Sequence, residues 1–204
     1  RENNRIIGTH NSGAYCFRSF IVSHCKLLRN VSQTQRLSIK QQLDAGVRFF
    51  DFRIAYYKKE FYLSHTFLCG KLVDELEHIK RFPEAIVNIR ADYWRDYQFP
   101  KQKLASVISQ YKGISFSCDK SSIYGIVPHL YDEIWPRVDK PEEIAPYVRE
   151  QLKISSKPVF INYTSELTWK DVLTGNSLLE KEAQYLEDFE GNIVAVLVDD
   201  FKAP

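Results

Sequence analysis

The chain has 204 residues, and 44% of them are hydrophobic. A chain of this length can bury one sizeable core, so we expect a single domain spanning residues 1–204. Its 28 Lys and Arg residues against 26 Asp and Glu give a net charge of +2, which argues against nucleic acid as a partner. We also expect no transmembrane segment, because no run of about 18 apolar residues occurs.

Short β-rich segments alternate with helical patterns along the whole chain. We expect a first strand at residues 5–7, which ends at Gly8-Thr9-His10, and further strands at residues 47–54, 85–90, 159–163 and 193–198. Helices are expected at residues 38–43, 73–82, 104–108, 141–152 and 178–186, and residues 114–126 are strand-like but ambiguous.

This alternation favours a parallel sheet covered by helices, either doubly wound or closed into a (β/α) barrel. No glycine-rich dinucleotide motif supports the first form. Barrel enzymes typically need about 250 residues and range down to about 200. We therefore predict an α/β fold of the irregular, trimmed (β/α) TIM-type barrel kind.

Polar residues interrupt the predicted strands at positions that face the barrel interior. Alternation along residues 49–54 places Asp51 and Arg53 on one face and the apolar side chains on the other, toward the helices. A charge in such an interior must be paired or face a ligand, so a structural ion pair is the alternative interpretation. The same alternation predicts further inward polar groups: Asn88, Arg90, and Asp200 on the face of Val196 and Val198.

Two histidines follow predicted strands, where barrel enzymes carry their catalytic groups. His10 follows the first strand, and His65 follows the apolar residues 61–63. Two imidazoles together with an inward arginine and carboxylates suit acid–base chemistry on a phosphate. We assign no role to the other three histidines, His24, His78 and His129.

Several segments resemble a known family. Residues 6–13 resemble the opening motif of phosphatidylinositol-specific phospholipases C, and residues 41–54 resemble their second block. The segments 62–65 and 84–90 look like the third block, and 160–165 and 196–201 are similar to late strands of the bacterial, metal-independent members. Residues 94–157 match poorly. The resemblance is to the X domain of this family.

The resemblance implies an enzyme that cleaves phosphatidylinositol-type phospholipids to diacylglycerol and a cyclic inositol phosphate. His10 would be the general base that takes the proton of the inositol 2-hydroxyl, and Asp200 would orient it. His65 would be the general acid for the diacylglycerol oxygen. With both histidines near the reference pKa of about 6.5, the expected pH profile is bell-shaped around neutrality.

The resemblance also implies how the phosphate is held. Arg53, held by Asp51, would bind the phosphoryl oxygens, and Arg90 would contact the substrate. Calcium-dependent members carry acidic ligands where this chain has the two arginines, so we expect no metal and no cofactor. A third possible function is that of a magnesium-dependent phosphodiesterase on a related barrel. Such an enzyme needs acidic ligands after the second strand, where this chain has Arg53.

Asn11 departs from the family pattern, in which the bacterial enzymes have an aspartate beside the histidine equivalent to His65. An amide cannot raise the basicity of an imidazole as a carboxylate does. We count Asn11 among the substrate-binding residues. The departure supports an alternative function, a catalytically weak or inactive module that binds lipid headgroups.

The expected partner is a phospholipid substrate at a membrane surface, and the chain is expected to be a monomer. A secreted or membrane-peripheral location is favoured. The four cysteines lack the close spacing of a metal site, and ordinary buried thiols are favoured over disulfides: Cys16, Cys25, Cys69 and Cys118.

Overall fold

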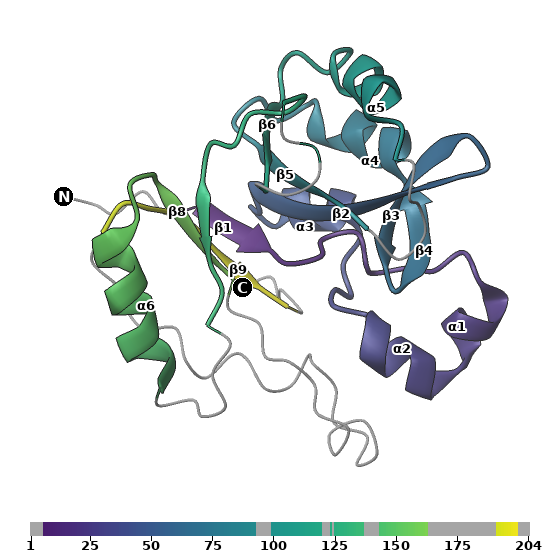
Figure 1. Cartoon of the computed structure of the whole chain (residues 1–204). Helices are drawn as coiled ribbons and strands as arrows, with labels where there is room; N and C mark the ends of the chain where they lie inside the picture. Colours follow the sequence, from purple (N-terminus) through teal and green to yellow (C-terminus); the bar gives the residue numbers. More distant parts are fainter. Residues whose placement is uncertain are drawn as a thin grey trace.

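The computed structural model of the chain describes residues 6–92, 99–119, 123, 125–136, 143–162 and 191–199, apart from the side chain of residue 31. Seven parallel strands form the wall of an irregular (β/α) barrel (Figure 1). In spatial order they are β6 (Ser115–Cys118), β5 (Ile86–Ala91), β2 (Phe49–Tyr57), β1 (Ile6–Thr9), β9 (Ile193–Val198), β8 (Val159–Asn162) and β7 (Asp132–Ile134). The predicted fold class is thereby confirmed.

The barrel has two irregular features. An antiparallel hairpin, β3 (Glu60–His65) and β4 (Phe67–Lys71), continues the sheet from the far end of β2. In the part of the chain that the structure describes, β6 and β7 share no ladder, so the wall has a seam between them. The barrel is therefore irregular, as predicted from the chain length, and its wall is interrupted at this seam.

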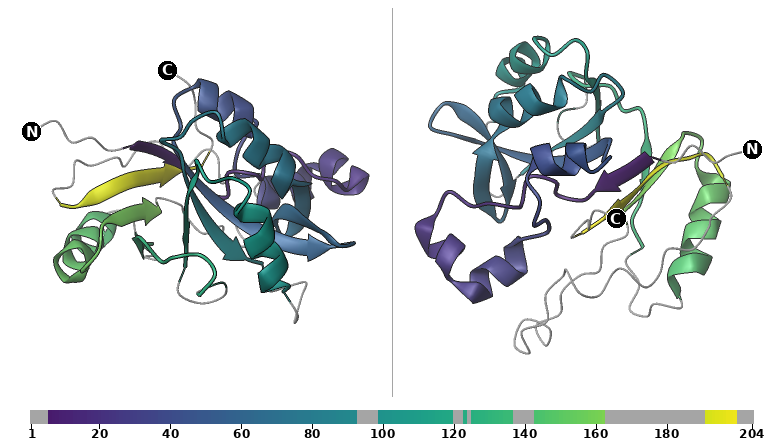
Figure 2. Two further views of the ribbon diagram at one scale, coloured as in Figure 1. Left: turned by 90° about the horizontal axis from the view of Figure 1, so that it is seen from above. Right: turned by 180° about the vertical axis from the view of Figure 1, so that it is seen from behind.

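Helices cover the outside of the sheet, and α6 lies on the opposite side from the others (Figures 1 and 2). They are α1 (Phe20–His24), α2 (Lys26–Ser32), α3 (Ile39–Asp44), α4 (Leu72–Ile79), α5 (Lys101–Ile108) and α6 (Ile144–Ile154). The Ser38 hydroxyl and the Gln41 side chain form a capping box that starts α3 where the sequence predicted a helix. None of the described helices is long and apolar enough to cross a membrane.

The alternation along β2 sorts its side chains between two cores. Phe50, Phe52 and Ile54 are fully buried in the large cluster that the sheet forms with α3 and α4. Phe49 lies on the other face and packs in the barrel interior against Phe160 of β8, with ring centroids 4.9 Å apart. Burial of each such side chain contributes about 1.5–3 kcal/mol. The predicted orientation of β2 is confirmed.

The orientation predicted for β9 is wrong. Ala195 and Leu197 pack with Phe49 in the barrel interior, whereas Val196 packs outward against the cluster under α6. Both faces of β9 are apolar, so alternation alone did not reveal which face points inward. The inward set therefore continues to residue 199, and Asp200 itself lies outside the described residues.

Other differences concern short or local elements. Among the described residues of the ambiguous segment 114–126, the strand is the short β6, and a turn follows at Ile123, whose carbonyl accepts the Ile126 amide. The sequence analysis missed β7, which has three residues, and the two short helices α1 and α2. The predicted helix at 178–186 lies outside the described residues. All four cysteines are unpaired; Cys69 and Cys118 are buried, as expected, but Cys16 is exposed.

The close approach of β1, β2 and β9 requires a glycine at position 8. It pairs with Phe49 on one side and Leu197 on the other. A Cβ at this position would overlap the Leu197 side chain and lie 3.1 Å from Cβ of Phe49. We expect Gly8→Ala to lower the free energy of unfolding by about 1–3 kcal/mol in urea denaturation. Gly113→Ala, where the added methyl meets open space, is the matched control, and equal midpoints for the two variants would contradict this packing.

Candidate active site

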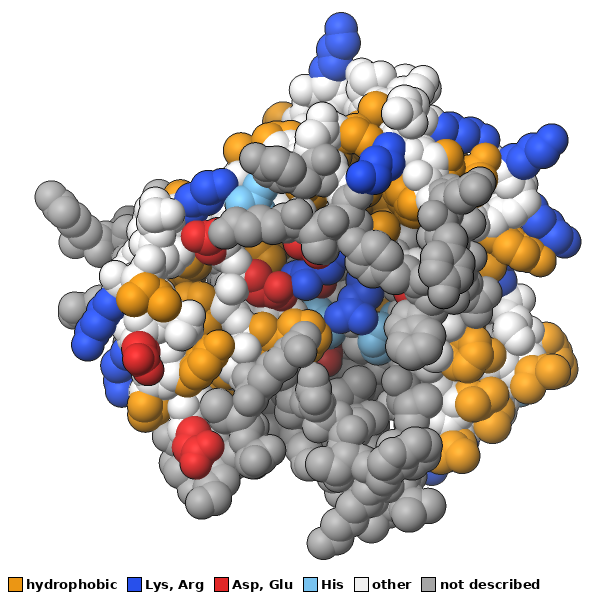
Figure 3. Space-filling model, viewed as in Figure 1, with side chains coloured by type: hydrophobic (Ala, Val, Ile, Leu, Met, Phe, Trp, Pro, Cys, Tyr) orange, Lys and Arg blue, Asp and Glu red, His pale blue; other side chains and the backbone are white. Residues whose placement is uncertain are grey.

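The carboxyl ends of β1, β2, β5 and β9 meet at one edge of the barrel because these strands are parallel. Histidine, acidic and basic side chains gather in a hollow in the middle of the face seen in Figure 3. Most of the candidate residues predicted at these strand ends lie together in the structure.

His10 follows β1 directly and is 5% exposed. Its Nδ1 lies 3.0 Å from Oδ1 of Asp199. A carboxylate only accepts, so Nδ1 carries the proton and Nε2 keeps its lone pair. The Asn11 amide nitrogen lies 3.0 Å from this Nε2. Burial lowers the pKa of His10 from 6.5 to about 3, so the ring is neutral at pH 7.

Among the described residues, the carboxylate that orients His10 is that of Asp199, whereas Asp200, the predicted partner, lies outside them. Asp199 follows the inward face of β9 and is 6% exposed. The prediction of Asp200 rested on the opposite face of β9, that of Val196 and Val198, being the inward one. Two consecutive aspartates at a strand end give no local signal that separates them.

His65 ends β3, and its ring centroid lies 6.4 Å from that of His10. Its Nδ1 lies 2.8 Å from the carbonyl oxygen of Ser32, so Nδ1 donates and Nε2 is the nitrogen available for proton transfer. Burial lowers the pKa of His65 to about 4, although the bond to Ser32 opposes that shift. The expectation that both histidines titrate near neutrality is wrong for the free protein.

Asn11 lies beside His10, not beside His65 as the resemblance implied. Its side-chain contacts are with His10, and the partner of His65 is a backbone carbonyl instead. The backbone of Asn11 has a φ of 42°, in the left-handed region that asparagine and aspartate tolerate better than most residues. This turn is what brings the amide over the imidazole.

Asp51 is fully buried and forms the centre of a polar network in the barrel interior. Its Oδ1 accepts hydrogen bonds from Nδ2 of Asn88 at 3.0 Å and from Nε of Arg90 at 3.3 Å. Arg90 also pairs with Glu133 of β7 at 2.5 Å, and Asn162 of β8 donates to the same carboxylate at 3.0 Å. Burial alone would raise the pKa of Asp51, but Arg90 and the other nearby cations hold it below its usual value.

Arg53 is not held by Asp51, because Arg90 takes that place. The Arg53 guanidinium lies 6.0 Å from the ring of Trp135, which is also 5.7 Å from the His10 ring. Nε of Arg53 is buried and has no hydrogen-bond partner among the described residues. A partly buried guanidinium that lacks a carboxylate is suited to bind an anion.

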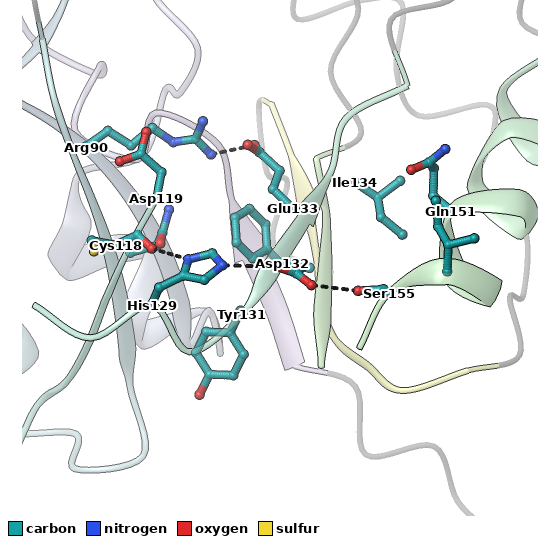
Figure 4. Close-up of a pocket in the computed structure, with 13 residues that line it drawn as sticks. Arg90, Cys118, Asp119, His129, Tyr131, Asp132, Glu133, Ile134, Gln151 and Ser155 are labelled. Atoms are coloured by element: carbon teal, nitrogen blue, oxygen red, sulfur yellow. Dashed lines mark hydrogen bonds and ion pairs between the residues drawn. The ribbon is translucent and has the colours of Figure 1, made fainter. Parts of the chain in front are cut away.

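A pocket of about 360 Å³ opens at the seam beside this site (Figure 4). The Arg90–Glu133 pair lies at one end of it. At the other end His129 bridges the carbonyl of Cys118 at 2.7 Å and the carboxylate of Asp132 at 3.0 Å. His129, to which we had assigned no role, thus links the two strands that share no ladder.

The residues missed by the sequence analysis are Ser32, Glu133, Trp135 and Asp199. Glu133 and Trp135 belong to or follow β7, a strand too short to show a pattern. Ser32 acts through its backbone carbonyl, which leaves no trace in the residue type. The sequence did carry one feature that could have indicated this part of the site: Glu133 stands two positions before Trp135.

No family model matches the chain. A PI-PLC X-box domain-containing protein of Dictyostelium discoideum is 33% identical over 90 residues, which cover 40% of this chain and 12% of that protein. The phosphatidylinositol-specific phospholipase C of Listeria monocytogenes superposes with a TM-score of 0.63 at 18% identity, covering 97% of this chain and 88% of that one. A Staphylococcus aureus phospholipase of the same specificity, studied for its membrane binding, gives 0.64 at 14%, with 98% and 88% covered. The chain thus shares the fold of these bacterial enzymes, and over 90 residues it is similar to a protein that contains a PI-PLC X-box domain.

Burial of two neutral histidines makes stability depend on pH. The folded-state pKa values of His10 and His65, about 3 and about 4, lie below the unfolded value of about 6.5. Between these values the unfolded chain binds protons at both rings and the folded chain does not. This stability is fully present above pH 6.5 and is lost as the pH falls toward 4. We expect a loss of about 2 kcal/mol per histidine between pH 7 and pH 5, measured by urea unfolding.

A double variant, His10→Gln with His65→Gln, should flatten this dependence. His78→Gln, a half-buried histidine on α4, is the matched control and should leave it in place. Unchanged pH dependence in the double variant would show that the two rings are not the source.

Proposed function

We propose that the protein is a phosphodiesterase of the phosphorus–oxygen lyase type, which cleaves phosphatidylinositol-type phospholipids to diacylglycerol and a cyclic inositol phosphate without a metal. The observation that carries the proposal is the pair of imidazoles 6.4 Å apart, each with Nδ1 bound to an acceptor and each near a guanidinium. Such a pair can remove one proton and supply another across a phosphodiester.

His10 is suited to the role of base. Asp199 holds its Nδ1 proton, so Nε2 takes the proton of the inositol 2-hydroxyl as that oxygen forms a bond to phosphorus. Asp199 then stabilises the imidazolium that results. The low pKa of His10 keeps the ring in its neutral, proton-accepting form at neutral pH.

His65 and Arg53 serve the other half of the reaction. As the bond from phosphorus to the diacylglycerol oxygen breaks, Nε2 of protonated His65 gives its proton to that oxygen, and Nδ1 stays bound to Ser32. The diester's negative charge favours the imidazolium form that the free protein disfavours. Arg53, whose Nε has no described partner, binds the phosphoryl oxygens as charge builds on them.

Two arginines supply the positive charge that a metal ion supplies in metal-dependent enzymes. Arg53 and Arg90 both act electrostatically on His10, and Oδ1 of Asp51 is already engaged by Arg90 and Asn88. A divalent ion at this place would meet two positive charges at short range. The same arrangement argues against a magnesium-dependent reaction. Arg90 and Glu133, which line the seam pocket, are suited to contact the headgroup.

Asn11 favours a second candidate function, a headgroup-binding module with little turnover. Its amide lies 3.0 Å from Nε2 of His10, the nitrogen that the base must use. A donor at that position competes with the inositol hydroxyl for the lone pair and lowers the basicity of the ring. Binding through Arg53 and Trp135 would not be affected by this contact.

The function is tested by turnover of phosphatidylinositol vesicles, with ³¹P NMR to identify the cyclic product. We expect the wild-type chain to release it in the presence of excess chelator, and His10→Ala and His65→Ala each to lose about 10²–10⁴ in rate. His78→Ala is the control for loss of a histidine elsewhere. Wild-type rates in both active-site variants, or loss of activity with chelator, would overturn the mechanism.

Asn11→Asp separates the two candidate functions in the same assay. Aspartate tolerates the backbone angle of this position, removes the competing donor and raises the basicity of the ring. If the wild type binds the vesicles without turnover and Asn11→Asp cleaves them, the natural protein is a binding module. If no variant binds or cleaves, both candidate functions fall.

The surface beside the site is suited to a membrane. Helices α1 and α2 project together from the barrel, and hydrophobic side chains gather over them (Figures 1 and 3). Phe20, Ile21 and Leu27 are 75%, 70% and 53% exposed, and the exposed cations Lys26 and Arg29 lie between and after them. Apolar side chains flanked by cations favour the interface of an anionic bilayer. This supports action on lipid at a membrane surface.

We expect Phe20→Ser combined with Ile21→Ser to weaken binding to phosphatidylinositol-containing vesicles about tenfold or more, because partial insertion of these two side chains contributes at least about 1.4 kcal/mol. Ile154→Ser is the matched control, since Ile154 is 71% exposed but ends α6 on the other side of the barrel. Vesicle co-sedimentation measures both. Equal losses in the two proteins would show that the α1–α2 surface does not dock.

A further inference from the structure

The segment that follows α2, residues 32–35, contacts both histidine-bearing parts of the chain. The Ser32 carbonyl accepts from Nδ1 of His65 at 2.8 Å. The Thr34 hydroxyl donates to the carbonyl of Asn11 at 3.1 Å. Three residues after Ser32, the Gln35 side chain donates to the backbone carbonyl of His10. One short segment therefore ties together the two rings whose spacing the reaction needs.

Gln35 makes a pair of contacts that join the two members of the His10–Asp199 pair. Its Nε2 donates to the carbonyl of His10 at 3.1 Å and to the carbonyl of Val198 at 2.9 Å. Val198 immediately precedes Asp199, and its carbonyl also accepts the backbone amide of His10 at 3.2 Å. The side chain is 0% exposed, so both contacts form away from water.

A neutral side chain with two N–H donors on one nitrogen suits this buried position. A primary amide nitrogen has two hydrogens. Here one is donated to the carbonyl of His10 and the other to the carbonyl of Val198, the residue before Asp199. A carboxylate at this position would repel both carbonyls, and an apolar side chain would leave buried acceptors without these donors. The amide thus holds the backbones of residues 10 and 198 at a set separation.

We propose that Gln35 is a positioning residue, which sets the distance between His10 and Asp199 and, through the segment 32–35, the spacing of the two imidazoles. The role in catalysis rests on the proposed function, whereas the role in positioning does not. Gln35 acts through the backbones of His10 and Val198, whereas the proposed phosphate ligand is Arg53 of β2. Its removal should therefore change turnover and leave the binding of phosphate intact.

The test compares Gln35→Met with Gln42→Met. Gln42 is also 0% exposed, and its Nε2 likewise donates to two carbonyls, those of Ser12 and Leu37, so it matches the cost of removing a buried amide. The readout is the imidazole N–H signal of His10 in protein labelled with ¹⁵N-histidine. We expect a downfield, exchange-protected Nδ1 proton in the wild type and in Gln42→Met, and a shifted or exchange-broadened signal in Gln35→Met.

Kinetics give the second readout, if the wild type turns over. A displacement of about 1 Å at a reacting group costs roughly 10²-fold, so we expect kcat of Gln35→Met to fall about that much while KM stays within about threefold. Gln35→Asn keeps the amide on a shorter side chain and should show a smaller change in both readouts. It also serves as the test variant if Gln35→Met does not fold.

The outcomes separate this proposal from the proposed function. An unchanged His10 signal in Gln35→Met and in Gln35→Asn overturns the positioning role, whatever the activity. Equal effects of Gln35→Met and Gln42→Met on the signal and on kcat also overturn it, since they indicate a general loss of structure. An inert wild type with a His10 signal that responds only at Gln35 supports the positioning role and rejects the lyase.

Discussion

The ion pair between Asp51 and Arg90 is the interaction on which the barrel interior depends. An unpaired carboxylate inside a low-dielectric core costs several kcal/mol, and Asp51 is fully buried. Arg90, on the neighbouring strand, compensates this charge and extends the network to Glu133 of β7. Since β6 and β7 share no ladder in the described chain, this chain of polar contacts also joins the two halves of the wall across the seam.

The same pairing determines which cation is available to a ligand. Arg90 is engaged by two carboxylates, whereas Arg53 approaches a tryptophan ring and keeps a buried nitrogen without a described partner. A guanidinium already held by carboxylates offers little to a phosphate, because the ion would have to displace them. The division of roles between the two arginines thus follows from the network around Asp51, not from the arginines themselves.

The two imidazoles are set up by different means. His10 is oriented by a carboxylate, which supports the imidazolium that a base becomes. His65 is oriented by a neutral carbonyl, so an anion bound nearby would have more influence on its protonation than on that of His10. The carbonyl belongs to the residue that ends α2, the helix beside the exposed apolar surface. The same short region of the chain therefore borders the exposed apolar surface and contacts His65 of the candidate site.

The sequence by itself determined the barrel, the inward direction of Asp51 and the placement of both histidines at strand ends. Strand alternation and the spacing of strands and helices are local properties, so they can be read from residue types. Tertiary structure alone decided that Asp199 holds His10, because both faces of β9 are apolar and two aspartates follow them. It also decided that Asp51 pairs with Arg90, because the partner of a buried charge depends on which neighbouring strand brings a cation within reach. The carbonyl of Ser32 and the place of Asn11 over His10 depend on the path of the backbone, which residue types do not encode locally.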